Sequence, residues 1–159
     1  MQRITPCLWF DTQGEEAANF YVSLFKNSRI LSVTHYGEAG PRPAGTVMTV
    51  SFELDGREFL ALNGGPEYKF TEAVSFQIMC EGQDEVDFFW DSLTEGGEEG
   101  PCGWLKDRYG VSWQVVPTIL SELINNPDPA RAQRAMQAMF QQRRIDIAEI
   151  RRAADSVPA

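Results

Sequence analysis

The sequence is poor in the residues that bind transition metals or form disulfides. Its 159 residues contain one histidine, His35, and three cysteines, Cys7, Cys80 and Cys102. The cysteines are odd in number, lie far apart and form no C-x-x-C pair, a pattern that excludes a disulfide framework and a zinc knuckle. We therefore expect reduced thiols.

Positive charge and long apolar runs are also scarce. The formal net charge is −9, and the four arginines of residues 143–152 are the one local exception, expected on a C-terminal helix. Such an acidic chain repels phosphate backbones and anionic lipid, so we expect no nucleic-acid partner. No segment resembles a signal peptide or approaches membrane-spanning length, which predicts a cytoplasmic protein without a membrane partner.

Aromatic and apolar residues are plentiful. The chain is 43% apolar and contains ten Phe, four Trp and four Tyr. This composition excludes a disordered chain and indicates a core or a pocket rich in rings. The length suits one well-buried domain or two small modules that share a core.

The first half of the chain has the order βαβββ. Four segments have strand character, and an apolar stripe with helical spacing follows the first of them. Asp55-Gly56 is a tight-hairpin signal before the last strand. The expected strands are residues 4–10, 29–36, 46–54 and 57–62, and the helix carries Ala17, Phe20, Tyr21, Leu24 and Phe25.

The second half repeats the first. A strand at residues 73–80 precedes a helix that opens at Gln83 or Asp84 and ends at Gly96-Gly97. Its stripe, Val86, Phe89, Trp90 and Leu93, matches Ala17, Phe20, Tyr21 and Leu24 at one constant offset of 69 residues. Strands are then expected at residues 102–106 and 111–116, so this half is a shortened βαβββ unit, and Glu95, Glu98 and Glu99 are expected to be surface charges around a glycine turn.

The remaining residues are expected to be helical. We predict a paired βαβββ domain over residues 1–117, with repeat one at 1–66 and repeat two at 73–117, followed by a helical extension over 118–159. In the extension, Asp128 and Pro129 are the N-cap and first residue of a helix whose apolar side carries Ala132, Ala135, Met136, Met139 and Phe140. This stripe packs on its own domain or on a second subunit, and we favour a homodimer.

Several strings of residues resemble one protein family. They are residues 4–10 (ITPCLWF), 16–21 (EAANFY), 62–66 (LNGGP), 102–107 (CGWLKD) and 110–114 (GVSWQ). Together with the repeat, they resemble the PhnB-like branch of the vicinal-oxygen-chelate superfamily, which includes glyoxalase I, extradiol dioxygenases and fosfomycin and bleomycin resistance proteins. The likeness covers nearly the whole chain, the C-terminal helices included. It implies an α+β fold in which two βαβββ repeats form a cupped half-barrel.

The resemblance also identifies the positions at which metal-using relatives hold their ion. They fall near Thr5 or Pro6, near Leu62 or Asn63, on Ser75 and on Gln114. None of these residues is anionic or an imidazole, and neutral oxygens offset the dehydration of Mg²⁺ or Mn²⁺ poorly. We therefore expect neither a metal nor another cofactor.

The same positions suit a pocket for a neutral polar ligand. Strand alternation puts Ser75 and Gln77 on one face, and Ser112 and Gln114 on one face of the last strand. With Asn63, and with Trp9 and Trp104 as rings for stacking, they are the expected substrate-binding residues, namely Trp9, Asn63, Ser75, Gln77, Trp104 and Gln114. The alternative is that the glutamines are half-buried barrel residues satisfied by backbone or water. Lys106 is expected in a solvated turn.

Two principal functions fit these residues. The first is a small organic molecule bound in a metal-free cup at a homodimer interface. The second is an isomerase, lyase or transferase in which His35 acts as acid and base while Asn63 or Gln114 polarises an oxygen. The methyltransferase label common in this branch, 3-demethylubiquinone 3-methyltransferase, fits less well, because no glycine-rich turn joins a strand to a helix as nucleotide-type cofactors require. A purely structural subunit is the remaining alternative.

Overall fold

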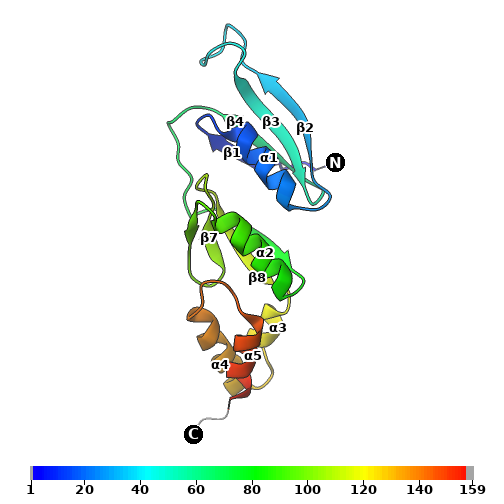
Figure 1. Ribbon diagram of the computed structural model, residues 1–159, viewed down its shortest axis with the longest axis vertical. Helices are drawn as coiled ribbons and strands as arrows, with labels where there is room; N and C mark the ends of the chain where they lie inside the picture. Colours follow the sequence, from blue (N-terminus) through cyan, green and yellow to red (C-terminus); the bar gives the residue numbers. More distant parts are fainter. Residues whose placement is uncertain (1, 157–159) are drawn as a thin grey trace. The chain divides into compact units, whose positions relative to one another are not determined.

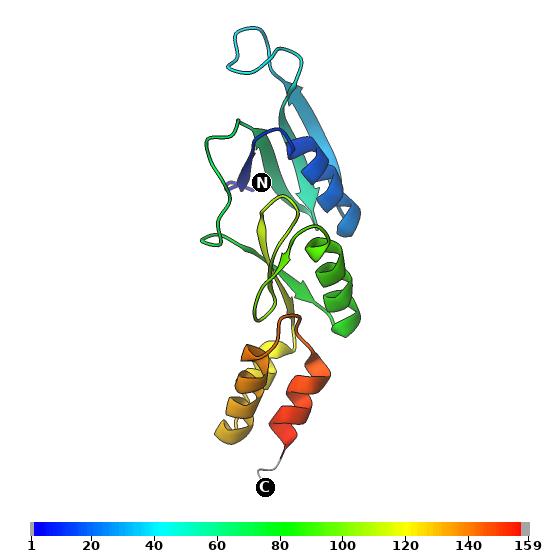
Figure 2. The same ribbon diagram turned by 60° about the vertical axis from the view of Figure 1, so that its left-hand side comes forward.

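The computed structural model describes residues 2–156, and the chain divides into two compact units, residues 1–70 and 71–159. The boundary falls between the two predicted repeats. Within residues 2–156, no helix is long and apolar enough to cross a membrane. Figures 1 and 2 present the elements, and each unit is described separately.

The first unit is one βαβββ repeat with its helix on a mixed four-stranded sheet (Figure 1). The sheet order is β1-β4-β3-β2; β1 runs parallel to β4, and the other neighbours are antiparallel. The order predicted from the sequence is therefore confirmed. The elements are β1 (Cys7–Phe10), α1 (Gly14–Leu24), β2 (Arg29–His35), β3 (Val47–Leu54) and β4 (Arg57–Asn63).

The predicted stripe of α1 forms the core of this unit. Ala17 and Tyr21 are fully buried, and the Tyr21 ring lies 6.4 Å from Phe52 on β3. Small residues on the helix let it approach the sheet, and the rings fill the remaining volume. Only one face of the sheet is covered in this way, because residues that alternate with Val50 and Phe52 along β3 are half-exposed.

The second unit begins with a second βαβββ repeat. Its sheet order, β5-β8-β7-β6, again has one parallel pair, β5 with β8. The repeat predicted at the helices is confirmed by burial, since Val86 and Trp90 of α2 are inaccessible like their counterparts Ala17 and Tyr21 in α1. Leu93 is also inaccessible, whereas its counterpart Leu24 is half-buried. The elements are β5 (Phe76–Cys80), α2 (Gln83–Thr94), β6 (Glu98–Glu99), β7 (Trp104–Lys106) and β8 (Ser112–Pro117).

This second repeat is complete, which corrects the expectation of a shortened unit. Glu98 and Glu99 form β6, paired with Lys106 and Leu105, where the sequence suggested charges around a turn. Gly97 permits the pairing because a Cβ on this residue would lie 2.1 Å from the backbone oxygen of Lys106. A side chain at position 97 would therefore push β6 away from β7.

Three helices complete the second unit. Asp128 caps α4 through a 3.0 Å bond from the Ala130 N–H, and Pro129 is its first residue, as predicted. A further helix, which the sequence analysis did not separate from its neighbour, begins after Asp146. The helices are α3 (Leu120–Ile124), α4 (Pro129–Phe140) and α5 (Ile147–Asp155), and their shared core contains Leu120, Ala135, Ile145, Ile150 and Ala154.

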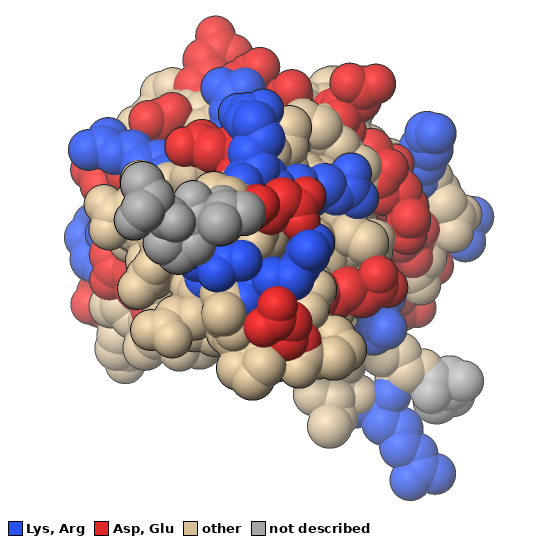
Figure 3. All heavy atoms as spheres, turned by 90° about the horizontal axis from the view of Figure 1, so that it is seen from below, with Lys and Arg blue, Asp and Glu red and all other residues tan. Residues whose placement is uncertain are grey.

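The apolar stripe of α4 is divided between its own chain and solvent. Ala135 is buried and Met139 packs against the helical core, whereas Met136 is 38% and Phe140 60% exposed. On the face seen in Figure 3, basic side chains lie among acidic ones; the ion pair between Arg131 and Asp155 joins α4 to the end of α5.

Candidate functional site

The sheet of the second unit has one face covered by α2 and one open face. Along β8, Trp113 and Val115 are buried, so Ser112 and Gln114 belong to the opposite, open face. The strand register places Trp104 across from Gln114 and Lys106 across from Ser112. Because directly paired residues share a face, the open face combines an indole, an amide, a hydroxyl and an ammonium group.

Three of the predicted binding residues form a hydrogen-bonded chain on this face. The Gln77 amide donates to Gln114 Oε1 at 3.1 Å, and the Gln114 amide donates to Ser75 Oγ at 2.9 Å. The chain fixes Gln114 between its neighbours while Gln77 stays exposed. A row of this kind offers a ligand both donors and acceptors.

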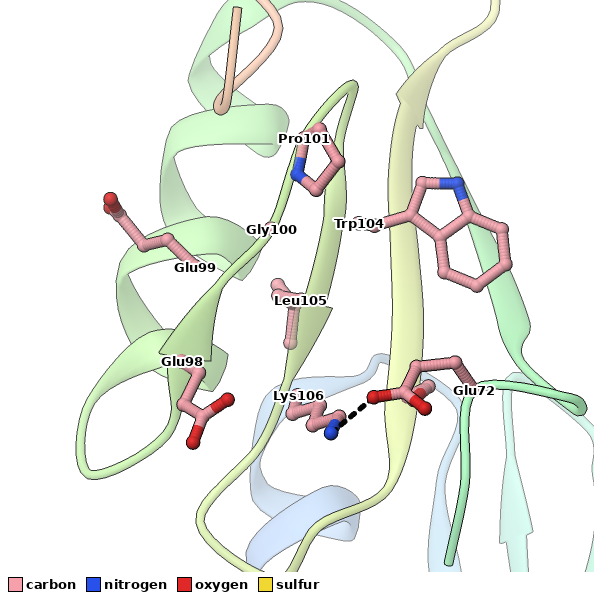
Figure 4. Close-up of a pocket in the computed structure, with 9 residues that line it drawn as sticks. Glu72, Glu98, Glu99, Gly100, Pro101, Trp104, Leu105 and Lys106 are labelled. Carbon is pink, nitrogen blue, oxygen red and sulfur yellow. Dashed lines mark ion pairs between the residues drawn. The ribbon is translucent and has the colours of Figure 1, made fainter.

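A pocket of about 370 Å³ lies at the β6–β7 edge of the sheet and includes Trp104 and Ser112 in its lining. Figure 4 shows that Lys106 and Glu72 point toward one another across it, whereas the Glu99 carboxylate points away. The lining residues are Glu72, Glu98, Glu99, Gly100, Pro101, Trp104, Leu105, Lys106 and Ser112.

Glu72 and Lys106 form an ion pair that further favours the charged form of both groups. The hydrogen bond from Lys106 lowers the pKa of Glu72, and the same bond raises the pKa of Lys106. Each group is therefore held in its charged form near neutral pH. Both are solvent-exposed, so the pair orients the two side chains and contributes little to folding stability.

Ser112 is the most unusual member of the pocket. It is 1% exposed, and its Oγ has no hydrogen-bond partner among residues 2–156. Buried hydroxyls nearly always have a partner, because an unpaired one loses its bonds to water without replacement. Ser112 thus contributes an unpaired donor and acceptor to the lining of the pocket.

Glu99 has a structural role on the helix side. Its Oε1 accepts a 2.9 Å hydrogen bond from the indole N–H of Trp90, and its Oε2 lies 3.7 Å from Arg143. The side chain thus ties β6 to α2 and satisfies the polar atom of a fully buried ring. Its charge is compensated outside the pocket.

In the first unit, Trp9 occupies the open side of its sheet. Its indole N–H donates to Gly65 O at 2.9 Å, and its ring meets Tyr68 edge to face at 4.9 Å. Gly64 lies against the ring, because a Cβ there would be 2.4 Å from Trp9. The predicted stacking residue is therefore held by the Gly64-Gly65 turn.

Asn63 lies on the helix-covered side of the same sheet. Its Oδ1 accepts a 2.7 Å bond from the Gly14 N–H at the start of α1, and its amide donates to Val47 O at 3.2 Å. The side chain is 6% exposed. Both functional ends are engaged, so the structure gives Asn63 the role of joining α1 to the sheet.

His35 ends the edge strand β2 and is exposed. It pairs with Val47, next to an irregularity in the register between Thr34 and His35. An exposed imidazole on an edge strand has the solvation of a surface residue. No pocket lining described above includes it.

The pocket contains residues that the sequence analysis assigned to other roles. Lys106 was expected in a solvated turn, but it ends β7 and pairs with Glu72. Ser112 was predicted to share a face with Gln114, because the two residues are two positions apart on one strand. The position of Glu98 in the pocket lining could not be predicted from the sequence, because the strand β6 that places it was not predicted.

No group of three or more His, Cys, Asp or Glu side chains suited to a metal ion occurs in the described part of the chain. Ser75 and Gln114, which the resemblance aligned with metal ligands, are instead hydrogen-bonded to each other. The hydroxyl of Ser75 and the amide of Gln114 would offer a metal ion only uncharged oxygen ligands.

Comparison with known proteins gives one family. The family described as 3-demethylubiquinone-9 3-methyltransferase matches residues 2–116. The match ends before α3, so it does not extend to the C-terminal helices that the sequence resemblance was expected to include. No curated protein matches the chain.

Solved structures agree with this family. A PhnB protein from Bacillus cereus, provisionally described as a 3-demethylubiquinone-9 3-methyltransferase, is 38% identical, with a TM-score of 0.67, over 74% of this chain and 100% of its own. A Pseudomonas aeruginosa protein is 20% identical, with a TM-score of 0.61, over 74% of this chain and 98% of its own. The fosfomycin resistance protein FosX of Listeria monocytogenes, complexed with Mn(II) and sulfate, is 15% identical, with a TM-score of 0.51, over 77% and 94% of the two chains. The last two likenesses establish the fold alone.

Proposed function

The chain belongs to the 3-demethylubiquinone-9 3-methyltransferase family, the PhnB-like branch of the vicinal-oxygen-chelate superfamily, and on that basis we propose that it binds a small organic molecule without a metal. The binding surface is the open face of the second sheet. One observation carries the proposal: the chain Gln77–Gln114–Ser75 lies on the same face as Trp104, which lines a pocket of about 370 Å³.

The polar chain and the indole supply complementary interactions. Gln77 is exposed and has hydrogen-bonding capacity beyond its bond to Gln114. Trp104 adds a partly exposed apolar ring, the group that most often anchors small ligands. Shape, a ring and a few amides are sufficient for reversible binding.

Metal-dependent chemistry does not fit these residues. The aligned positions Ser75 and Gln114 are neutral and satisfy each other, so nothing offsets the dehydration of a divalent cation. These neutral groups support a metal-free site in the present chain, whereas its distant structural neighbour FosX was solved with Mn(II).

The methyltransferase activity in the family description is not part of the proposal. Each sheet has one parallel pair in a four-stranded mixed arrangement. A typical methyltransferase of the nucleotide-binding type uses a doubly wound parallel sheet with a glycine-rich turn into a helix. Neither βαβββ repeat has that architecture.

We also propose a homodimer in which a second copy helps to close the cup. Met136 and Phe140 remain exposed on α4 after the rest of its stripe has packed within the chain. Neighbouring apolar side chains that stay exposed mark a surface suited to an interface. Light scattering after size exclusion should give twice the chain mass, and Phe140→Ser should lower it; a monomeric wild-type protein would contradict the dimer.

The binding proposal is tested by thermal-shift titration of the purified protein. Mg²⁺, Mn²⁺, Ni²⁺ and Zn²⁺ are compared with S-adenosylmethionine and with a panel of small aromatic and hydroxylated metabolites. A ligand at about a hundred times its Kd stabilises the native state by about 2.7 kcal/mol, a clear rise in Tm. We expect an organic metabolite to give this rise and Gln114→Leu to reduce it.

The matched control is Gln137→Leu, which changes an exposed glutamine on α4. A rise in Tm with a metal would contradict the metal-free site, and one with S-adenosylmethionine would support the activity in the family description. If no member of the panel changes Tm, the binding proposal is wrong and a structural role is favoured.

A further inference from the structure

We propose that the pocket of β6 and β7 selects a small organic cation, a protonated amine carried on a flat apolar group. This inference rests on the proposed binding function and adds the chemical class of the ligand. It follows from the charges that line the pocket, from its one ring and from the unpaired hydroxyl of Ser112.

The charges on the lining residues leave one carboxylate uncompensated. Lys106 is paired with Glu72, and Glu99 is bonded to Trp90 on the helix side. Glu98 is exposed, and no ion pair of its own is found within residues 2–156. It lies across from Lys106 in the strand register and lines the pocket. The hydrogen bond and charge of Glu72 are the main reasons that the pKa of Lys106 is raised, and the charge of Glu98 adds to them.

A negative pocket discriminates between ligands of opposite charge. An ammonium group gains attraction from Glu98, whereas a carboxylate is repelled and finds Lys106 already paired. A neutral group gains neither effect. Charge therefore predicts the order amine, then alcohol, then acid.

Ser112 provides the second observation. Its hydroxyl is buried, unpartnered within residues 2–156 and part of the pocket lining. It accepts a hydrogen bond from an N–H and so offers an ammonium group a second contact besides Glu98. A ligand that pairs with this oxygen removes the cost of leaving it unsatisfied.

The apolar part of the ligand is expected to lie on Trp104. The ring is partly exposed and projects beside Lys106 and Glu72 in Figure 4, while Pro101 and Leu105 complete the apolar lining. Offset stacking of flat groups on an indole is favourable. The volume of about 370 Å³ is at the small end for ligand pockets, which suits one fused ring with a short amine chain.

The inference is tested with tryptamine, tryptophol and indole-3-propionate, which share an indole and a two-carbon chain and end in an ammonium, a hydroxyl and a carboxylate. Isothermal titration calorimetry on the full chain measures each Kd. We expect tryptamine to bind at least about tenfold more tightly than tryptophol, in line with a hydrogen bond to a charged group, and indole-3-propionate to bind most weakly.

Two variants connect the preference to the proposed groups. Glu98→Gln should remove the preference for tryptamine, whereas Glu122→Gln, the same charge change on an exposed residue of α3, should leave it intact. Ser112→Ala should weaken tryptamine binding by about tenfold. It should not lower the Tm of the free protein, because the hydroxyl that it removes has no partner within residues 2–156, so a loss of binding is not a loss of folding.

The outcomes separate this inference from the binding function. Equal or tighter binding of the alcohol or the acid, or an unchanged preference in Glu98→Gln, overturns the cation inference. If no indole probe binds while a metabolite from the panel gives a Gln114-dependent rise in Tm, the inference fails and the binding function stands. If neither probes nor panel bind, both fail.

Discussion

Replacing Asn63 with alanine should test whether this residue belongs to the fold or to the ligand. The substitution removes the acceptor of the Gly14 N–H at 2.7 Å and the donor to Val47 O at 3.2 Å. Gly14 is buried, so its N–H finds no water in exchange. An unsatisfied buried donor costs about 1–3 kcal/mol, and the void left by the shortened side chain adds about 1 kcal/mol.

We therefore expect Asn63→Ala to lower the free energy of unfolding by about 2–4 kcal/mol. Urea denaturation followed by far-UV circular dichroism measures the change, with equal m-values as the check that the comparison is valid. The matched control is Asn19→Ala on the exposed side of α1, where the amide donates to Glu15 O one turn earlier. Alanine is a better helix former, so this variant should be neutral or slightly more stable.

The result that would refute the reasoning is an Asn63→Ala protein as stable as wild type. If such a protein also lost affinity for a metabolite, Asn63 would return to the ligand-binding role predicted from the sequence. Unchanged affinity in a destabilised variant would confirm the structural role.

Three further substitutions probe the second unit. Asp107→Ala should lower the free energy of unfolding by about 3 kcal/mol or more in thermal unfolding. The buried Asp107 carboxylate accepts three hydrogen bonds, including one of 2.9 Å from the Trp113 indole N–H. A loss below about 1 kcal/mol would contradict this role. Gly97→Ala should lower the free energy of unfolding by about 1–3 kcal/mol in the same assay. Gly37→Ala should be tolerated, because a Cβ at this position would have no atom within 4 Å. Equal effects of the two substitutions would contradict a steric clash at Gly97. Burial raises the pKa of the Cys80 thiol from 9.0 to about 12, so the folded state favours the protonated form and its stabilising effect should decline as pH rises from 9.0 to about 12. Urea unfolding at pH 8 and 10.5 should show wild type losing more stability than Cys80→Ala, and equal losses would contradict the shift.

The helices and most strands could be predicted because their apolar residues recur with a clear period. Ala17 and Tyr21, and their counterparts Val86 and Trp90, are buried as their spacing required. The two-residue strand β6 could not be found in this way, because two exposed glutamates carry no alternation. The start of α5 was missed since no glycine or proline marks the break after α4.

The candidate site was predicted less completely than the fold. Ser75, Gln77 and Gln114 were placed on one face by alternation, and the structure joins them by hydrogen bonds. Asn63 lies with Ala61 on the helix side of β4, where its side chain is bonded to Gly14 and Val47, and its role in ligand binding stays a prediction. Glu72 and Lys106 meet only through tertiary structure, which no local pattern reports.

Gly97 and Gly100 flank β6 and restrict the backbone path of the pocket wall, but they do not restrict the side chain between them. A Cβ at Gly97 would meet Lys106 O at 2.1 Å and one at Gly100 would meet Trp104 O at 2.8 Å, so the backbone of the wall tolerates little change at either end. The Glu98 side chain, between them, is exposed, so its replacement should disturb the fold little. A single substitution at position 98 can therefore change the charge of the pocket wall while its backbone path is inherited unchanged.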